Sequence, residues 1–138
     1  MNPKTVMCFG TFDLLHLGHL HYLKQARKHG NYLIAVVARD RTKQQQGRKP
    51  IFNERERLEL LRSLKLVDEV VLGNHGDFLK IVHQRKPDVI CLGYDHTINE
   101  RELRRKLMVE GYSPRVVRAG PYKPVSQKSH RIRLALGI

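Results

Sequence analysis

Short apolar runs recur along the chain, with longer stretches of helical spacing between them. Four of the five runs are rich in Val or Ile, which is typical of strands in a sheet. Because strands and helices alternate, the pattern predicts parallel strands joined by crossover helices. We therefore expect an α/β fold with a mainly parallel five-stranded sheet, its strands at residues 5–9, 32–38, 69–72, 89–92 and 116–119.

Helical spacing is clearest in two of the intervening stretches. Residues 17–29 place three apolar side chains on one face, and Gly30 follows as a helix stop. A second helix is expected to begin after Asn53, whose side chain suits the N-cap position. The result is a three-layer α/β/α sandwich, and 138 residues predict a single domain over 1–138. Further helices are expected at 77–85, 99–110 and 129–136.

Ligands of open α/β sheets bind beyond the carboxyl ends of the strands, so the loops there are the candidate site. One of them, 41–49, is basic and has no apolar periodicity. We expect it to be an irregular, mobile loop that can close over an anionic ligand, with Lys43, Arg48 and Lys49 as candidate phosphate contacts. A solvated charged loop is the simpler interpretation of the same residues. The loops expected at this edge are 10–19, 39–49, 73–77, 93–97 and 120–129.

The loop after the first strand brings two histidines, His16 and His19, to the start of a helix. Histidines three residues apart lie on the same side of a helix, and Gly18 between them leaves no side chain to block a phosphate. The unpaired N–H groups and the dipole of a helix start attract negative charge. Two imidazoles aimed at one oxyanion can donate hydrogen bonds as charge builds on a transferred phosphate. The segment therefore predicts phosphate binding and phosphoryl chemistry.

Two other interpretations of these histidines stay open at this point. In one they are helix-start residues with a structural role only; in the other they ligate a metal together with His21 or Asp13. Neither a G-x-G-x-x-G fingerprint nor a Walker A lysine loop occurs in the chain. Dinucleotide binding of the usual kind and P-loop chemistry therefore do not explain this loop.

Basic residues outnumber acidic ones by 26 to 13, which gives a formal net charge of +13. Such an excess favours polyanionic partners, either nucleic acid or a triphosphate held together with a phosphorylated acceptor. Cys8 and Cys91 lie singly within apolar runs, so neither a disulfide nor a zinc site is expected. No apolar run has the length of a signal peptide or a membrane span, so we expect a cytoplasmic protein that does not bind a membrane.

Residues 10–19 read Gly-Thr-Phe-Asp-Leu-Leu-His-Leu-Gly-His, which resembles the first loop of the cytidylyltransferase-like nucleotidyltransferases with its HxGH motif. The resemblance extends through nearly the whole chain, and the fold that it implies is Rossmann-like. Arg57 and residues 67–70 lie where the glycerol-3-phosphate cytidylyltransferases have an arginine and a similar stretch. The chain is most similar to the archaeal type of FAD synthetase, through segments 36–40, 47–52 and 92–95.

The resemblance implies roles for individual residues. His16, His19 and Arg57 would be catalytic, contacting the phosphates and stabilising the transition state. Asp95 and Tyr122 would contact the nucleoside, although a turn residue and a packing residue are the plainer interpretations of the two. In the last loop only Ser129 matches the adjacent Ser/Thr residues of the family. The nucleotide-binding residues implied in this way are Thr11, Phe12, His16, Leu17, Gly18, His19, Asp95, Tyr122 and Ser129.

The implied reaction is attack by an acceptor phosphate oxygen on the α-phosphorus of a nucleoside triphosphate, with release of pyrophosphate. A divalent metal, Mg²⁺ or similar, would enter with the triphosphate, and no protein-ligated metal is expected. FMN with ATP, giving FAD, is the favoured pair, because the subfamily resemblance points there and Phe52, Tyr94 and Tyr122 could flank an isoalloxazine ring.

Two alternatives to this reaction are kept. The first is glycerol 3-phosphate or another phospho-alcohol as acceptor, with CTP as donor. The second is of a different class, a non-catalytic nucleic-acid-binding domain, suggested by the net charge and the basic residues within 101–106. No RNA-binding motif with interleaved aromatic residues occurs, which makes nucleic acid the less favoured partner. A homodimer is expected from the habit of the family.

Overall fold

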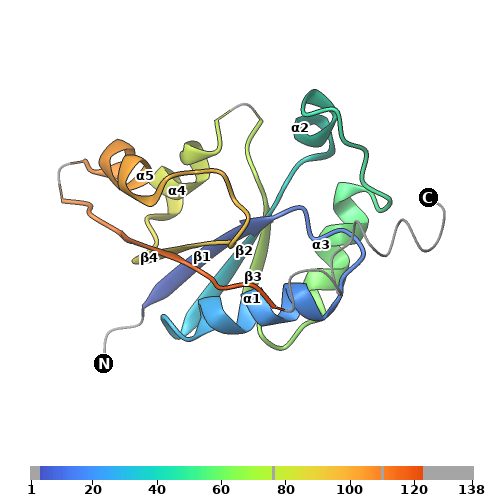
Figure 1. The fold of residues 1–138 in the computed structure, drawn as a ribbon, viewed down its shortest axis with the longest axis horizontal. Coiled ribbons are helices and arrows are strands. Elements are labelled where there is room, and N and C mark those ends of the chain that lie inside the picture. Colours follow the sequence, from blue (N-terminus) through green and yellow to red (C-terminus); the bar gives the residue numbers. More distant parts are fainter. Residues whose placement is uncertain (1–3, 76, 110, 123–138) are drawn as a thin grey trace.

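The computed structural model of the chain describes residues 4–75, 77–109 and 111–122. Five strands form one sheet in the order β3-β2-β1-β4-β5, and each neighbouring pair is parallel. The ribbon in Figure 1 shows the strands at the centre with helices on either side. The strands are β1 Thr5–Gly10, β2 Tyr32–Val37, β3 Glu69–Leu72, β4 Val89–Leu92 and β5 Arg115–Arg118.

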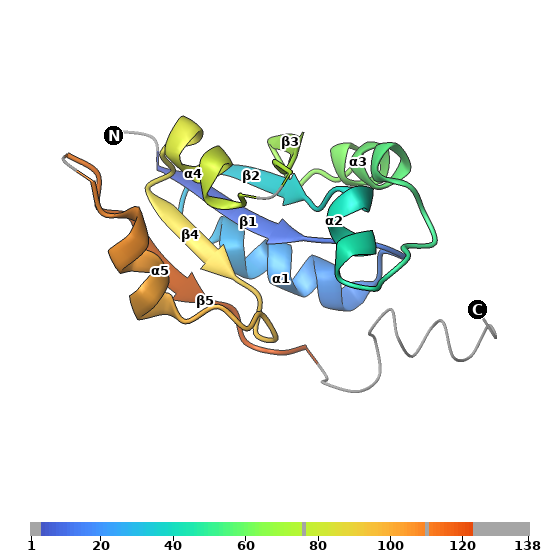
Figure 2. The same cartoon turned by 90° about the horizontal axis from the view of Figure 1, so that it is seen from above.

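Helices cover both faces of this sheet and make the three layers. One core cluster joins the sheet to α1 and α3 through side chains such as Leu23 and Leu61. The other joins it to α4 and α5 through side chains such as Val82 and Leu103. The short helix α2 stands beyond the carboxyl ends of the strands (Figure 2). The helices are α1 Leu17–Arg27, α2 Asp40–Gln45, α3 Glu54–Arg62, α4 Leu79–Arg85 and α5 Glu100–Leu107.

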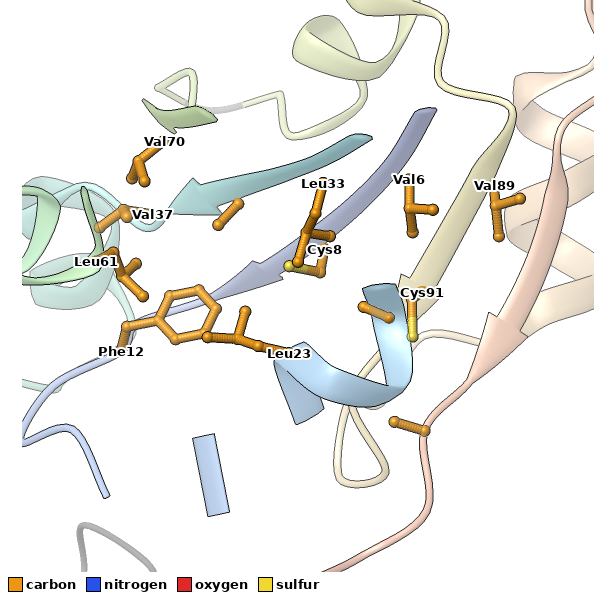
Figure 3. Close-up of a cluster of buried hydrophobic side chains, with 13 residues drawn as sticks. Val6, Cys8, Phe12, Leu23, Leu33, Val37, Leu61, Val70, Val89 and Cys91 are labelled. Atoms are coloured by element: carbon orange, nitrogen blue, oxygen red, sulfur yellow. The ribbon is translucent and has the colours of Figure 1, made fainter. Parts of the chain in front are cut away.

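The first core cluster reaches as far as the candidate site. The ring of Phe12, from the loop after β1, is 2% exposed and belongs to the same cluster as Leu23 of α1 and Leu61 of α3 (Figure 3). Cys8 and Cys91 are buried in this cluster as free thiols, as expected from their apolar surroundings. The packing of the hydrophobic core therefore holds one residue of the predicted nucleotide site in place.

The strands and four helices confirm the pattern read from the sequence, with ends that differ by about three residues or fewer. The expectation of an irregular loop after β2 is wrong over Asp40–Gln45, which form α2. The helix expected at 129–136 lies outside the described residues. Among the residues that the structure describes, no helix has the length and apolar character needed to span a bilayer.

The order of the strands identifies where a ligand would bind. The chain moves from β1 to β2 on one side and later returns to place β4 on the other side of β1. In open parallel sheets this reversal opens a crevice at the carboxyl ends of the two diverging strands. Here the crevice lies between the end of β1, which leads to His16 and His19, and the end of β4, which leads to Asp95.

Candidate active site

A cleft of about 1140 Å³ lies at the carboxyl edge of the sheet and is lined by the loops that follow all five strands. Its volume slightly exceeds the usual range for a single small ligand, which suits a site for two substrates. Leu17 is 51% exposed and does not line the cleft, and neither does Arg57 or Phe52. Of the residues singled out in the sequence, the cleft brings together Thr11, Phe12, His16, Gly18, His19, Lys43, Arg48, Lys49, Tyr94, Asp95 and Tyr122.

The two histidines hold each other at the start of α1. His16 is the N-cap, and its Nδ1 accepts a hydrogen bond from the backbone N–H of Gly18 at 3.1 Å. The Nδ1 of His19 accepts in turn from the backbone N–H of His16 at 3.2 Å. This is the reciprocal arrangement of a capping box, made here with two imidazoles. The ring centroids lie 4.0 Å apart.

These contacts decide the protonation of both rings. An Nδ1 that accepts a hydrogen bond carries no proton, so each ring is neutral with its proton on Nε2. Burial lowers the pKa of His16. Burial also lowers the pKa of His19, to about 3, and the neighbouring His16 contributes because two adjacent rings cannot both be protonated without repulsion. Each histidine therefore keeps one N–H donor, at Nε2, for a ligand in the cleft.

The loop before the histidines folds back over the end of β1. Phe12 and Leu14 have positive φ angles of 56° and 51°, a conformation that is uncommon outside glycine. The Phe12 ring lies so close to Gly10 that a Cβ atom there would approach it to 2.9 Å. The ring packs 5.8 Å from His19 and stacks on Tyr22 at 6.4 Å. The backbone of this loop therefore places the Phe12 ring in the core, where it packs behind His19.

Asp13 joins this loop to the segment before α3. Its carboxylate accepts from the backbone N–H groups of Ile51 at 2.7 Å and Phe52 at 3.0 Å. The side chain is 4% exposed. The carboxylate thus has a structural use, which argues against the interpretation of Asp13 as a metal ligand beside the histidines.

Arg57 does not occupy the place that the resemblance implied. The prediction of direct phosphate contact is not what this structure shows, because the side chain is fully buried. Its guanidinium donates to the carbonyl oxygens of Thr11 and Phe52, at 2.8 and 3.0 Å, and pairs with the Asp40 carboxylate at 2.6 Å. Arg57 therefore ties the first loop to the start of α2 and α3.

Helix α2 brings basic residues to the cleft. Lys43 is 8% exposed, and its ammonium group donates to the side chain of Gln46 at 3.0 Å. Burial is the main cause that lowers the pKa of Lys43, and the nearby charges of Arg48 and Arg57 lower it further. Arg48 and Lys49, at the end of the same segment, are exposed side chains that also line the cleft.

The loop between β4 and α5 forms the opposite wall. Asp95 is exposed to the cleft. The neighbouring His96 accepts from the backbone N–H of Gly93 through Nδ1 at 2.9 Å, and burial lowers its pKa. Arg118 donates to the carbonyl oxygens of Gly93 and His96, at 2.8 and 2.7 Å. The sequence analysis did not identify Arg118 as a site residue. A charged residue inside a short apolar strand could have indicated such a role.

Beyond β5 the chain is tied to α1. The side-chain amide of Gln25 both donates to the carbonyl of Gly120 and accepts from its N–H, at 3.2 and 2.9 Å. The ring of Tyr122 then packs against His21 at 5.2 Å. These contacts hold Tyr122 at the cleft, whereas Ser129 lies outside the described residues.

The donor set of the site does not resemble a metal centre. Within the part of the chain that the structure describes, no three His, Cys, Asp or Glu side chains gather closely enough to hold an ion. His16, His19 and His96 each accept a backbone N–H through Nδ1, and Asp13 is engaged as described above. A metal held by the protein therefore does not fit these residues.

Comparison with known proteins supports the same interpretation. The family model described as cytidylyltransferase-like matches residues 7–134. A protein named FAD synthase from Thermoplasma volcanium is 46% identical, with 93% of this chain and 90% of that protein covered. Another FAD synthase, from Methanohalophilus mahii, is 44% identical over 92% of this chain and 89% of its own length.

A solved structure matches as well. The crystal structure described as the lipopolysaccharide core biosynthesis protein from Thermoplasma volcanium has a TM-score of 0.84 and 47% sequence identity. The match covers 88% of this chain and 99% of that one. With the paired histidines at the switch point of a parallel sheet and a family model that spans almost the whole sequence, this chain belongs to the cytidylyltransferase-like family of nucleotidyltransferases.

Proposed function

We propose that this enzyme transfers the adenylyl group of ATP to FMN. A phosphate oxygen of FMN attacks the α-phosphorus, the bond from that phosphorus to the bridging oxygen of the β-phosphate breaks, and diphosphate leaves. The attacking phosphate is already anionic, so no general base and no covalent enzyme intermediate is needed. FAD is the product.

The observation that carries this proposal is the pair of neutral imidazoles at the start of α1. Both Nε2–H groups remain for a ligand, and the capping contacts fix the rings before any ligand arrives. Fixed donors of this kind stabilise negative charge that develops on a transferred phosphoryl group without a cost for reorganisation. We assign His16 and His19 to the oxygens of the α-phosphate, and the unobstructed Gly18 to the approach of the phosphate chain.

The remaining cleft residues divide between the nucleoside and the phosphates. Asp95 and Tyr122 stand on the β4 and β5 side of the histidines and are assigned to the nucleoside of ATP. Lys43, Arg48 and Lys49 stand on the α2 side, where their positive charge suits the leaving diphosphate. Thr11 and Phe12, in the loop after β1, also line the cleft and are assigned to the nucleotide. Arg57 is assigned a positioning role, because it holds the carbonyl of Thr11 rather than a ligand.

The divalent cation belongs to the substrate in this proposal. Mg²⁺ or a similar ion would enter as the complex of ATP and supply charge neutralisation on the diphosphate. The chain contributes the basic residues around α2 and the two imidazole donors, which position the same phosphates.

The proposal is tested by offering the purified protein two substrate pairs. We expect diphosphate release and FAD formation with FMN and ATP, and neither with glycerol 3-phosphate and CTP. The relatives named FAD synthase support the first pair. Turnover of the second pair alone would replace the proposal with a phospho-alcohol cytidylyltransferase. RNA binding that weakens steeply with salt, without nucleotide turnover, would favour the nucleic-acid-binding alternative.

A homodimer, a cytoplasmic location and a single domain over residues 1–138 are further proposals that come from the sequence and the family. Light scattering of the purified protein measures the first directly. A single cooperative unfolding transition, seen equally by two spectroscopic probes, would support the last.

A further inference from the structure

The side-chain amide oxygen of Asn74 is a buried polar atom at the cleft. The Oδ1 atom of Asn74, in the loop after β3, is buried and accepts no hydrogen bond from any described residue. Asn74 lines the cleft. A buried acceptor without a donor costs free energy, so such an atom in a binding site points to a donor supplied by the ligand.

The surroundings of Asn74 are apolar. We define the apolar chamber as the part of the cleft lined by Asn74 together with Phe9, Val36, Phe78, Ile81 and Leu92. The five hydrophobic side chains all belong to the core cluster between the sheet and α4 and α5. The rings of Phe9 and Phe78 meet edge to face at 5.2 Å. The cleft therefore reaches an aromatic and aliphatic wall that carries a single amide.

This combination describes a class of ligand. Apolar walls with an aromatic pair favour a flat ring system, and a lone buried amide favours a ring edge that presents N–H beside a carbonyl. The isoalloxazine of FMN has such an edge, where N3–H lies between two carbonyl groups. Glycerol 3-phosphate has neither a ring nor an apolar surface to bury.

We propose that the apolar chamber is the acceptor subsite for the isoalloxazine ring, with Asn74 Oδ1 accepting the N3–H. This inference rests on the proposed function and adds the residues that select the acceptor. It departs from the expectation that Phe52, Tyr94 and Tyr122 flank the ring: Tyr94 and Tyr122 line the cleft, but Phe52 does not. Asn74 thus acts as a specificity residue.

The position of the apolar chamber leaves the rest of the cleft to the donor nucleotide. The side chains of the chamber come from β1, β2, β4, the start of α4 and the loop after β3, on the sheet face that α4 and α5 cover. The histidines begin α1, which covers the other face, and Asp95 and Tyr122 follow β4 and β5. An acceptor ring in the chamber and a nucleoside beside Asp95 and Tyr122 would therefore occupy different parts of one cleft, with both phosphates near the histidines.

The first experiment uses the unaltered protein and a modified flavin. FMN and N3-methyl-FMN are titrated by flavin fluorescence in the presence of α,β-methylene-ATP, whose carbon bridge prevents adenylyl transfer. We expect the methylated flavin to bind about 10-fold or more weakly, because it lacks the donor that Asn74 needs. Equal affinity for the two flavins would overturn the subsite assignment.

The second experiment removes the amide with Asn74→Ala and uses Gln84→Ala, an exposed position on α4, as the matched control. Asn74→Ala should bind FMN about 10-fold more weakly and lose the discrimination against N3-methyl-FMN, while Gln84→Ala keeps both values. Discrimination that survives in Asn74→Ala would overturn the role of Asn74.

The two proposals fail in different ways. If the unaltered protein makes FAD from FMN and ATP but tolerates the N3-methyl group, the function stands and the subsite assignment falls. If it neither makes FAD nor binds FMN, both fall together.

Discussion

The hydroxyl of Tyr22 donates to the backbone carbonyl of Cys91 at 2.6 Å, and it accepts from the backbone N–H of Phe9 at 3.1 Å. The last residues paired between β1 and β4 are Cys8 and Cys91. The hydroxyl therefore bridges the two strands where their ladder ends and the crevice begins. Its ring also stacks on Phe12, so a single α1 side chain contacts both the strand ends and the loop behind the histidines.

Replacing Tyr22 with Phe should test this bridge. The change leaves the ring in place but leaves a buried N–H and a buried carbonyl without the hydroxyl, so we expect a loss of about 1–3 kcal/mol in the free energy of unfolding. We also expect kcat for FAD formation to fall about 10-fold or more, because the strand ends that carry the two walls shift. Urea unfolding and steady-state kinetics measure the two effects.

Tyr32→Phe is the matched control for this prediction. Its hydroxyl donates to the Glu69 carboxylate at the amino ends of β2 and β3, away from the cleft at the carboxyl ends. Its kinetics should match those of the unaltered protein. Wild-type kcat in Tyr22→Phe would show that the bridge does not position the site.

His19→Asn distinguishes the roles of the two imidazole nitrogens, the acceptor Nδ1 and the donor Nε2. The amide oxygen of asparagine can still accept the His16 N–H, but the donor at Nε2 is gone. We expect kcat to fall about 10²–10³-fold, the cost of one oxyanion donor, with little change in stability. His29→Ala, beyond the end of α1, provides the control. Near wild-type turnover in His19→Asn would remove this histidine from the chemistry.

The lowered pKa values predict how activity and stability depend on pH. Because the pKa of His19 is about 3 in the folded protein, ring protonation should not limit kcat/KM between pH 5 and 7. A change in the His19 ring signals near pH 6.5 in an NMR titration would contradict the buried neutral ring.

The lowered pKa of His19 should also make the protein less stable at low pH. Below pH 6.5 the unfolded chain binds a proton at His19 that the folded chain does not bind until about pH 3. The free energy of unfolding should therefore fall as the pH falls through this window, by about 1.4 kcal/mol per pH unit from this group. Comparison of urea unfolding at pH 7 and pH 5 with His19→Asn isolates the contribution. An identical pH dependence in the two proteins would refute it.

Arg57→Lys distinguishes positioning from phosphate contact. Lysine keeps the charge but cannot reach the carbonyls of Thr11 and Phe52 and the Asp40 carboxylate at once. We expect a loss of about 2–4 kcal/mol in stability, together with lower kcat. Unchanged stability with a raised KM for ATP alone would instead show that Arg57 contacts the phosphates.

Much of the fold could be predicted because the relevant signals are local. Apolar runs identified all five strands, and Asn53 was recognised as the N-cap of α3 from its residue type. The sequence analysis did not predict helix α2 because the contacts that hold its first residue come from α3. The Asp40 carboxylate pairs with Arg57, and the Asp40 backbone N–H donates to Glu54. The pattern of apolar and polar residues within 40–45 cannot predict contacts with residues that lie so far along the chain.

The sequence by itself determined the alternation of strands and helices and the placement of His16 and His19 at a helix start, because both follow from neighbours within a few residues. The tertiary structure alone decided which side chains meet around the cleft. It buried Arg57, set Tyr22 between β1 and β4, and placed Asn74 Oδ1 in an apolar wall where none of the described residues donates to it. Each of these depends on contacts between distant segments, whose geometry is set only when the layers pack together.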